Sequence, residues 1–396
     1  MPQPIDEILY VAGNPQTVRD MPKVPALAPF SAQAVDFLHG LSQRLQTPEA
    51  RAFSDVATFA FWCRKASLMR EKAKYDNAGP RLGLGVAFHS TPSNVPVNFA
   101  FSFAAGLLAG NANIVRLPGR DFKQVDLIGQ AVNETLEARP EMKPYVVMVK
   151  YESAAKGVSD YFSAICDARI VWGGDMTIAR MRQSPLPPRA REINFADRYS
   201  ILVLQSEAVL QTDSLERLAR DFYNDTYFSD QNACSSPSLL VWLGRDKQKA
   251  KEIFWNAVAK LKDRYSLAPV QAVAKLKAFY LASAARPVRL VPSEDNFITR
   301  VAVEALDDAL LDFKEHSGFF FEYEADDISE ILPVCTGKCQ TLTYYGLDKQ
   351  EIVNFIMRHA PRGVDRIVPL GQSLNFSLIW DGHDLITGLS RVIGTS

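Results

Sequence analysis

Short apolar segments that alternate with helical segments constrain this chain more than any other feature of its sequence. Strand-like runs lie at 84–89, 113–117, 145–150, 168–172 and 199–205, and stretches with helical apolar spacing separate them. Strands that alternate with helices at this spacing form a largely parallel sheet with helices on both faces. Such sheets bind ligands at the carboxyl ends of their strands. The sequence therefore predicts an α/β fold.

The pattern extends to both sides of this region. Helical spacing is present at 31–45 and 54–74 before it, and at 215–228, 247–262 and 269–285 after it, with a further strand at 239–243. A chain of 396 residues is long enough for two domains. We place the junction near Gln205.

The amino-acid composition and net charge of the chain limit what it can be expected to bind and where it can be expected to reside. Hydrophobic residues make up 47% of the chain and charged residues 22%, with a formal net charge of -1, which is typical of a globular protein. This balance gives no electrostatic reason to expect binding to nucleic acid. The most apolar run, 95–110, is shorter than a membrane span. Asp6 and Glu7 stand where a signal peptide carries positive charge. Five scattered cysteines indicate reduced thiols, so we expect a cytoplasmic protein.

One of these cysteines, Cys234, lies in a loop of small polar residues at 228–238, between a helix and a strand. A cysteine in such a loop is a candidate nucleophile, provided that its surroundings favour the thiolate. A buried structural cysteine is the alternative interpretation. Cys335 and Cys339 are four residues apart, but neither a second pair nor a nearby histidine completes a zinc site. We therefore expect no metal.

Three separated segments carry a resemblance to a known family. They are GVAFHSTPSNVPVNFAFSFAAGLLAGNANIVRLPG at 85–119, IVWGGDMTIAR at 170–180 and DQNACSSPS at 230–238. In order and spacing they resemble the aldehyde dehydrogenase superfamily, and within it the acyl-CoA reductase (LuxC-type) branch. The run GVDRIVPLGQSLNFSLIWDGHDL near the end of the chain is similar to the same branch.

The resemblance implies an aldehyde dehydrogenase-like α/β architecture of two Rossmann-like parallel-sheet domains with the active site in the cleft between them. Residues 1–205 would form the nicotinamide-dinucleotide-binding domain, to which the tail at about 370–396 would return. Residues 206–370 would form the catalytic domain that carries the nucleophilic cysteine. A homodimer is the assembly that the family implies.

The resemblance also assigns the reacting groups. Cys234 matches the family's nucleophile, and Asn94 matches the asparagine that, with the backbone N–H of Cys234, stabilises the oxyanion. Asn94 could equally cap the helix that follows it. Gln340 and Thr341 match a loop that lines the site in the LuxC-type branch.

Arg116 occupies the position of the family's cofactor-binding lysine. NAD-preferring members carry a glutamate three residues later, where this chain has Gly119, followed by Arg120. The loss of a carboxylate and the gain of a cation favour a 2′-phosphate, so NADPH is the expected cofactor and NADH the alternative. A solvated basic turn is the structural alternative. The remaining expected cofactor-binding residues are Thr91, Pro92, Pro118, Gly173, Gly174 and Asp175.

The sequence departs from hydrolytic aldehyde dehydrogenases at the general base. Their glutamate stands in a Leu-Glu-Leu-Gly-Gly-like stretch, whereas the matching stretch here is 192–198, with Asn194 at or beside the aligned position and no Gly-Gly. Without a base, water attacks an acyl-enzyme thioester slowly, and the thioester survives for reduction. Glu192 and Asp197 are the alternative bases.

These features predict NADPH-dependent reduction of an acyl thioester to an aldehyde through an acyl-cysteine intermediate. The acyl donor would be a fatty acyl-CoA or an acyl-protein, and an acyl-transferring enzyme could supply it. The alternatives are an oxidative aldehyde dehydrogenase that hydrolyses the acyl-enzyme, a non-redox acyl carrier on the same fold, and an inactive scaffold.

Overall fold

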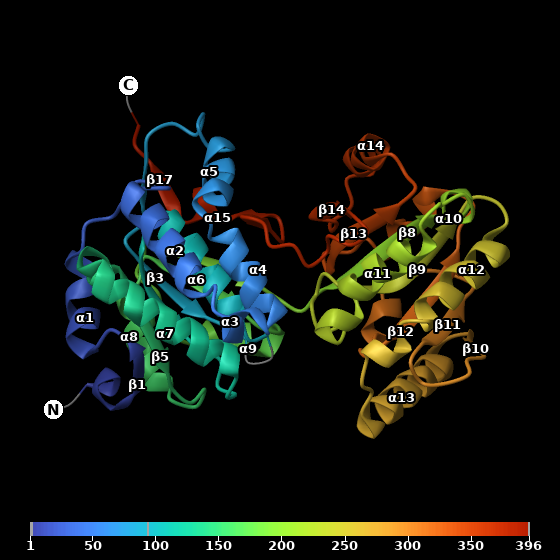
Figure 1. Ribbon diagram of the computed structural model, residues 1–396, viewed down its shortest axis with the longest axis horizontal. Helices are drawn as coiled ribbons and strands as arrows, with labels where there is room; N and C mark the ends of the chain where they lie inside the picture. Colours follow the sequence, from blue (N-terminus) through green and yellow to red (C-terminus); the bar gives the residue numbers. More distant parts are fainter. Residues whose placement is uncertain (1–2, 93–94, 395–396) are drawn as a thin grey trace. The chain divides into compact units, whose positions relative to one another are not determined.

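The computed structural model describes residues 3–92 and 95–394, and the chain divides into two compact units. The first unit comprises the residues up to Ala196 together with those from Phe376 onward, and the second comprises Asp197–Asn375. Each unit is built on a mainly parallel β-sheet (Figure 1). The parallel α/β architecture predicted from the alternation of strands and helices is confirmed.

The first unit has a six-stranded sheet in which only the edge strand β1 is antiparallel to its neighbour. The chain begins β3 at Val86 and ends it at Ser90, and all five residues are buried, as expected of a central parallel strand. The strands, in their order across the sheet, are β1 (Leu9–Ala12), β5 (Val146–Lys150), β4 (Ala112–Arg116), β3 (Val86–Ser90), β6 (Ala168–Trp172) and β7 (Arg191–Phe195).

Helices of the first unit bury the apolar faces that the spacing predicted. In α7, for example, Val125, Ile128 and Val132 are buried. The helices are α1 (Pro15–Asp20), α2 (Ala32–Arg44), α3 (Pro48–Arg51), α4 (Ser54–Trp62), α5 (Lys65–Ala73), α6 (Asn98–Leu108), α7 (Lys123–Ala138), α8 (Lys156–Ile165), α9 (Asp175–Met181) and α15 (Leu385–Gly388). Short 3-10 turns are η1 (Pro4–Glu7), η2 (Met21–Lys23) and η3 (Pro140–Tyr145).

The segment 54–74, predicted as a single helix, is two helices. The backbone of Arg64 is extended, so α4 ends at Trp62 and α5 begins at Lys65. The buried positions also change face at this break, since Phe59 and Cys63 are buried before it and Leu68 after it. Apolar periodicity does not detect a single extended residue between two helices.

The C-terminal segment returns to the first unit. There β17 (Ser390–Val392) pairs antiparallel with β2 (Arg81–Gly83), and β15 (Ile379–Trp380) pairs with β16 (His383–Asp384). The side chain of Asn111 donates to the carbonyl oxygen of Leu389 at 2.9 Å. This bond connects the end of the chain to the loop that enters β4.

The second unit has a seven-stranded sheet, and β8 (Tyr199–Gln205) lies inside it between β9 (Pro237–Leu243) and β13 (Cys339–Tyr345). The junction therefore lies between residues 196 and 197 and not near Gln205, because the strand that we placed at the end of the first domain is a central strand of the second. The other strands are β10 (Val288–Val291), β11 (Thr299–Val303), β12 (Phe319–Glu324) and β14 (Arg366–Pro369).

Both faces of this second sheet are covered. Successive residues of β9 point into different cores, so that Val241 packs on one face while Trp242 packs on the other with Phe254 of α12. The helices are α10 (Ser206–Leu210), α11 (Leu215–Asp225), α12 (Lys247–Ala259), α13 (Pro269–Ala285) and α14 (Lys349–His359), with 3-10 turns η4 (Tyr227–Ser229), η5 (Lys262–Arg264), η6 (Leu310–Phe313) and η7 (Ile328–Val334).

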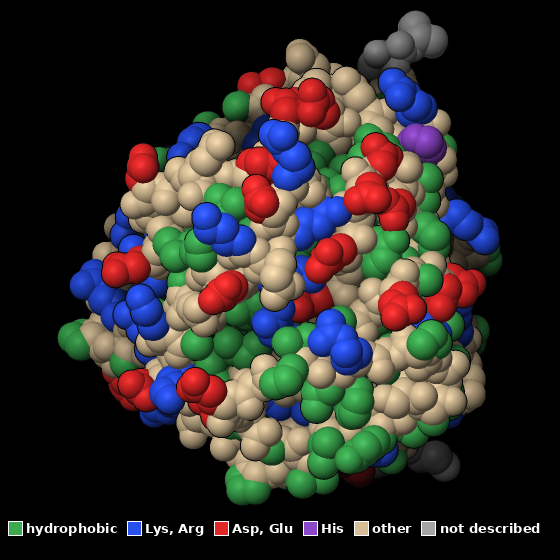
Figure 2. Space-filling model, turned by 90° about the vertical axis from the view of Figure 1, so that its right-hand side faces the viewer, with side chains coloured by type: hydrophobic (Ala, Val, Ile, Leu, Met, Phe, Trp, Pro, Cys, Tyr) green, Lys and Arg blue, Asp and Glu red, His purple; other side chains and the backbone are tan. Residues whose placement is uncertain are grey.

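The outer face of α13 is unusually apolar for an exposed helix. Hydrophobic side chains gather in the lower part of the face shown in Figure 2, where α13 lies in Figure 1. The exposed residues of this helix face are Val270, Val273, Leu276, Tyr280 and Leu281. Among the helices of residues 3–92 and 95–394, none is long and apolar enough to cross a membrane.

Candidate active site

The candidate nucleophile lies in the loop between η4 and β9 of the second unit. Cys234 is partly exposed, whereas Cys63, Cys166, Cys335 and Cys339 are buried. Burial raises the pKa of the Cys63 thiol, and it raises the pKa of Cys166 to about 12. Buried thiols that stay protonated are poor nucleophiles, so exposure alone favours Cys234 for chemistry.

Two consecutive residues of this loop have left-handed backbones: φ is 54° at Asp230 and 58° at Gln231. Side chains other than glycine rarely adopt this conformation, so neighbouring groups must stabilise it. The buried amide of Gln231 donates from Nε2 to the carbonyl oxygens of Pro237 (3.1 Å) and Phe319 (3.0 Å). Its Oε1 accepts from the N–H groups of Gly318 (2.9 Å) and Phe319 (3.3 Å). Gln231 thus ties the loop to the first residues of β9 and β12.

Asp230 ties the same loop to α13. Its carboxylate accepts from the Tyr265 hydroxyl, from Ser317 Oγ at 3.0 Å and from Gln271 Nε2 at 2.8 Å. Burial, together with the hydrogen bond to Asp230, raises the pKa of Tyr265. Lys275 of α13 lies in the same cluster and donates to the carbonyl oxygen of Ser317 at 2.9 Å. Burial lowers the pKa of Lys275 to about 8. The loop is therefore held by partly buried polar contacts on the side of α13.

The residues predicted to line the site lie close to the backbone of Cys234. Ser200 of β8 donates from Oγ to the carbonyl oxygen of Cys234 at 2.7 Å, and the same Oγ accepts from the N–H of Thr341 at 3.2 Å. Gln340 and Thr341 are buried, and the Thr341 hydroxyl donates to Gln340 Oε1 at 3.2 Å. One serine therefore connects the loop that carries Cys234 to the strand β13. Ser200 was not singled out from the sequence, because a serine in an apolar run gives no local signal.

Asn94, which was predicted to stabilise the oxyanion, lies outside the described residues. Its neighbours in the chain are the end of β3 at Ser90 and the beginning of α6 at Asn98. The assignment of Asn94 therefore rests on the resemblance alone.

The predicted cofactor-binding residues gather at one edge of the first sheet. Thr91 follows β3, Arg116 ends β4, and Gly173 follows β6, at the carboxyl ends of three adjacent parallel strands. Thr91 Oγ1 donates to the carbonyl oxygen of Arg116 at 2.6 Å. The carboxyl edge is where doubly wound sheets bind nucleotides.

This edge offers groups that fit a dinucleotide. The Arg116 guanidinium lies over the Tyr151 ring, 4.8 Å from its centroid, and Nη2 donates to the Tyr151 carbonyl oxygen at 3.4 Å. The Nε of Arg116 and the Oγ of Ser90 are buried, with no partner in the part of the chain that the structure describes. A Cβ added at Gly119 or Gly174 would meet no described atom within 4 Å. Unsatisfied donors beside open backbone are what an anionic cofactor requires.

The other predicted residues at this edge contribute in different ways. Pro92 is partly buried and Pro118 is buried beside the glycine turn. Asp175 is the first residue of α9 and is exposed, so its carboxylate adds negative charge near Gly174. This charge does not favour a phosphate next to α9, and a phosphate would be better placed beside Arg116.

A buried polar chain lies beneath this edge, and sequence reasoning missed it. Trp172 Nε1 donates to Ser102 Oγ at 2.9 Å, and Ser102 Oγ lies 2.8 Å from His89 Nδ1. His89 Nε2 lies 3.0 Å from Asn113 Oδ1. Burial lowers the pKa of His89 to about 4, so the ring is neutral at pH 7. The one feature of the sequence that could have indicated this chain is the presence of polar residues within otherwise apolar strands and helices.

Glu192, one of the two alternative general bases, is not poised to accept a proton. Glu192 accepts from Arg169 Nε at 2.8 Å, from Arg182 Nε at 2.8 Å and from Asn194 Nδ2 at 2.8 Å. Burial acts to raise its pKa, but the hydrogen bonds from these three residues outweigh it and hold the pKa below its ordinary value. Asp197 is exposed and pairs with Lys314 at 3.2 Å. A carboxylate held by two arginines is a weak base.

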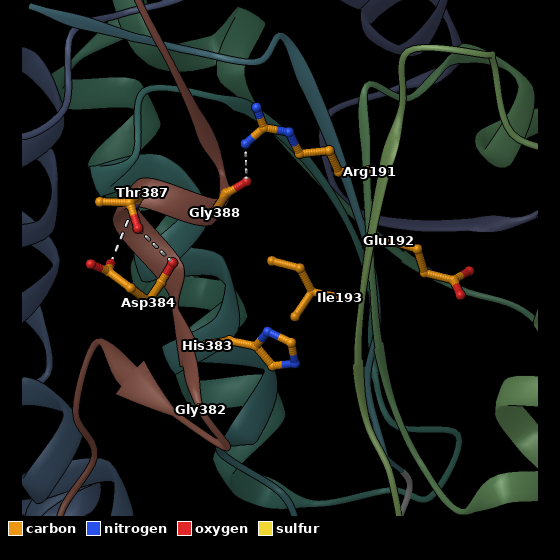
Figure 3. A pocket seen from close by; sticks show the side chains of 8 residues that line it. All are labelled: Arg191, Glu192, Ile193, Gly382, His383, Asp384, Thr387 and Gly388. Atoms are coloured by element: carbon orange, nitrogen blue, oxygen red, sulfur yellow. Dashed lines mark hydrogen bonds between the residues drawn. The ribbon is translucent and has the colours of Figure 1, made fainter. Parts of the chain in front are cut away.

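A pocket of about 490 Å³ in the first unit lies elsewhere, between the edge strand β7 and the C-terminal segment (Figure 3). The side chains of Ile193 and His383 point toward each other inside it, while that of Glu192 points away. Arg191 Nη1 donates to the Gly388 carbonyl oxygen at 2.9 Å across its rim. The pocket is shallow and open, and it contains no predicted cofactor-binding residue. Within residues 3–92 and 95–394, no group of three metal-binding side chains is present.

Solved structures identify the class of the fold. A NAD-dependent benzaldehyde dehydrogenase from Corynebacterium glutamicum is similar over 95% of this chain and 88% of its own, with 12% identity and a TM-score of 0.63. A mutant indole-3-acetaldehyde dehydrogenase, AldA from P. syringae, in complex with NAD+ and IAA, is similar over 95% and 87%, with 12% identity and a TM-score of 0.66. Aldehyde dehydrogenase 21 from Physcomitrella patens, in complex with succinate, is similar over 95% and 87%, with 13% identity and a TM-score of 0.64. The fold is that of the aldehyde dehydrogenases, as predicted.

A family model narrows this class. The model of the acyl-CoA reductase (LuxC) family matches residues 24–289, which is more than half of the chain. The chain belongs to the LuxC family of acyl-CoA reductases, and both the resemblance and the predicted class of enzyme are confirmed. No curated protein sequence matches the chain significantly.

Proposed function

We propose that the protein reduces an acyl thioester to an aldehyde, with NADPH as the reductant and Cys234 as the residue that carries the acyl group. The observation that carries this proposal is the contrast between Cys234, which is partly exposed in an anchored loop, and the four other cysteines, which are buried. The family match supports the acyl-CoA chemistry, and the residues at the carboxyl edge of the first sheet support a nicotinamide dinucleotide.

The first step transfers the acyl group. The thiolate of Cys234 attacks the thioester carbonyl carbon, and the carbonyl oxygen becomes an oxyanion. The backbone N–H of Cys234 and the side chain of Asn94 donate to this oxyanion, a contribution that is typically worth about 10²–10³ in rate for each donor. The carbon–sulfur bond to the carrier then breaks and the carrier leaves as a thiolate. The product is an acyl-Cys234 thioester.

The second step reduces this thioester. NADPH, held by Arg116, Gly173 and Gly174, would supply the hydride that the acyl carbon accepts. The oxyanion that results is held by the same donors, and its collapse expels the Cys234 thiolate and releases the aldehyde. Hydrolysis of the thioester competes only weakly with this reduction, because the Glu192 carboxylate accepts hydrogen bonds from Arg169 and Arg182 and does not act as a base. The long life of the thioester therefore favours reduction over formation of a free acid.

The cofactor preference follows from the turn after β4. Gly119 and Arg120 are exposed, and no described atom would lie within 4 Å of a Cβ at Gly119. An absent carboxylate and an added cation suit the 2′-phosphate of NADPH. Arg116 would hold the nucleotide with its unsatisfied Nε, and Gly173 and Gly174 would let the backbone approach it.

The test is the absorbance change at the nicotinamide band with a panel of acyl-CoAs and with NADPH or NADH. We expect oxidation of NADPH that depends on acyl-CoA and yields an aldehyde. The variant Cys234→Ala should lose this activity by about 10³-fold or more. The matched control Cys166→Ala removes a buried thiol of the first unit and should retain it. Undiminished activity of Cys234→Ala would refute the assignment.

The same panel separates the alternatives. Formation of free acid from an aldehyde without CoA would indicate an oxidative dehydrogenase, and acylation without nucleotide binding would indicate an acyl carrier. An acyl-protein donor, and an enzyme that supplies it, are tested by replacing acyl-CoA with an acylated carrier protein. Homodimer formation, which the family implies, is tested by light scattering of the purified chain.

A further inference from the structure

Ser200 lies where the sheet of the second unit is irregular on both sides. On β13, Cys339 pairs with Tyr199 and Leu342 pairs with Ile201, so two residues lie opposite Ser200. On β9, Pro237 pairs with Ser200 and Leu239 pairs with Ile201, so one extra residue is inserted there. Bulges change the direction of side chains, leave backbone groups outside the regular ladder and are frequent beside active sites.

The hydroxyl of Ser200 satisfies backbone groups at these irregularities. It accepts from the N–H of Thr341, which belongs to the bulge on β13, and it donates to the carbonyl oxygen of Cys234, which precedes β9. Ser200 is fully buried, so water does not readily replace either bond. The hydroxyl therefore donates its single hydrogen to the candidate nucleophile and accepts a hydrogen bond from the strand that carries Gln340 and Thr341.

We propose that Ser200 is the positioning residue of the active site, and that its hydroxyl fixes the Cys234 backbone relative to Gln340 and Thr341. The inference rests on the proposed function of Cys234. Ser200 does not touch the reacting atoms. It acts through the carbonyl group of the nucleophile, whose position sets that of the sulfur atom. A displaced nucleophile reacts more slowly even in a folded protein.

The experiment compares Ser200→Ala with Ser200→Thr and with the matched control Ser206→Ala. Ser206 follows the other end of β8, is equally buried, and its hydroxyl has no partner within the described residues. The first readout is the rate at which iodoacetamide alkylates Cys234 at several pH values, measured by mass spectrometry of the peptide. The second is kcat and KM for acyl-CoA reduction. All rates are measured below the unfolding temperature of each variant.

We expect Ser200→Ala to lower both the alkylation rate of Cys234 and kcat by about tenfold or more, with KM for NADPH unchanged. Ser200→Thr, which retains the hydroxyl, should recover most of the loss, and Ser206→Ala should match the wild type. Wild-type alkylation of Cys234 in folded Ser200→Ala would overturn the inference, as would an equal loss in Ser206→Ala. Alkylation requires neither acyl-CoA nor NADPH, so failure of the proposed reaction would be seen separately.

Discussion

Gln231 and Phe319 are joined by a two-way hydrogen bond: the amide Nε2 donates to the Phe319 carbonyl oxygen at 3.0 Å, and Oε1 accepts from the Phe319 N–H at 3.3 Å. The side-chain amide thus makes the same pair of hydrogen bonds with the backbone of Phe319 that a neighbouring strand would make. It fixes the loop three residues before Cys234, although the residue's own backbone is left-handed.

The variant Gln231→Glu tests this anchor with almost no change in volume. A carboxylate cannot donate, so the carbonyl oxygens of Pro237 and Phe319 would face negative charge in a buried site. We expect the free energy of unfolding to fall by about 2–5 kcal/mol at pH 7, and to recover in part at pH 5 as the buried carboxyl binds a proton. Urea denaturation at both pH values measures this. The exposed control Gln211→Glu should change little, and equal stability of the two variants would contradict the role of Gln231.

His89 makes stability depend on pH. Its pKa is about 4 in the folded protein, because burial disfavours the charged ring, against an ordinary value of 6.5. Between these two pH values the unfolded chain binds more protons, so stability rises with pH. The neutral His89 ring therefore contributes about 3 kcal/mol to the free energy of unfolding. This contribution is complete above pH 6.5 and is lost as the pH falls to 4.

The measurement is the difference in unfolding free energy between wild type and His89→Gln from pH 4 to pH 7. We expect the slope in this window to be smaller in the variant. The control His359→Gln changes an exposed histidine and should keep the wild-type slope. Identical slopes in all three proteins would show that His89 titrates normally.

The variant Glu192→Gln separates structure from catalysis. Arg169 is only 2% exposed, so removal of its partner leaves a buried cation uncompensated and should cost about 3 kcal/mol of stability. If Glu192 is not the base, the slow hydrolysis of the acyl-enzyme should not change. The exposed pair of Arg139 and Glu141 supplies the control Glu141→Gln, with an expected cost near zero. A loss of hydrolysis in Glu192→Gln would favour the oxidative alternative.

Gly119→Glu tests the cofactor preference. No described atom would lie within 4 Å of the new Cβ, so the side chain should be accommodated without strain. A carboxylate beside the 2′-phosphate should raise KM for NADPH about tenfold or more and leave KM for NADH nearly unchanged. Gly394→Glu, also in open surroundings, is the control. An unchanged ratio of the two KM values would remove Gly119 from the cofactor site.

The sequence was sufficient for the four central strands of the first sheet, because each is largely apolar and a helix follows it, but the edge strands β1 and β7 were not predicted. The sequence was insufficient where the position of a strand in a sheet depends on pairing between segments that are distant in the chain. Tyr199–Gln205 was recognised as a strand, but its place beside β13 follows from contacts about 140 residues away. The five strands β10 to β14 were not predicted, and among them β10 is largely exposed and its composition is not distinctive.

The candidate site, too, could be predicted from the sequence only in part. Cys234 could be selected from its loop and from the resemblance. The bonds that join Ser200 to Cys234 and to Thr341 could not, because they connect residues 34 and 141 positions apart. The pairing of Glu192 with Arg169 was also invisible in the sequence, although it weakens one of the two alternative bases.

The acyl-enzyme itself provides the most direct test of the central claim. The purified protein is mixed with a long-chain acyl-CoA in the absence of nicotinamide, and peptides are mapped by mass spectrometry. We expect one acyl group per chain, located on Cys234, that disappears as aldehyde when NADPH is added. The absence of an acyl adduct, or an adduct at another residue that persists in Cys234→Ala, would contradict the account.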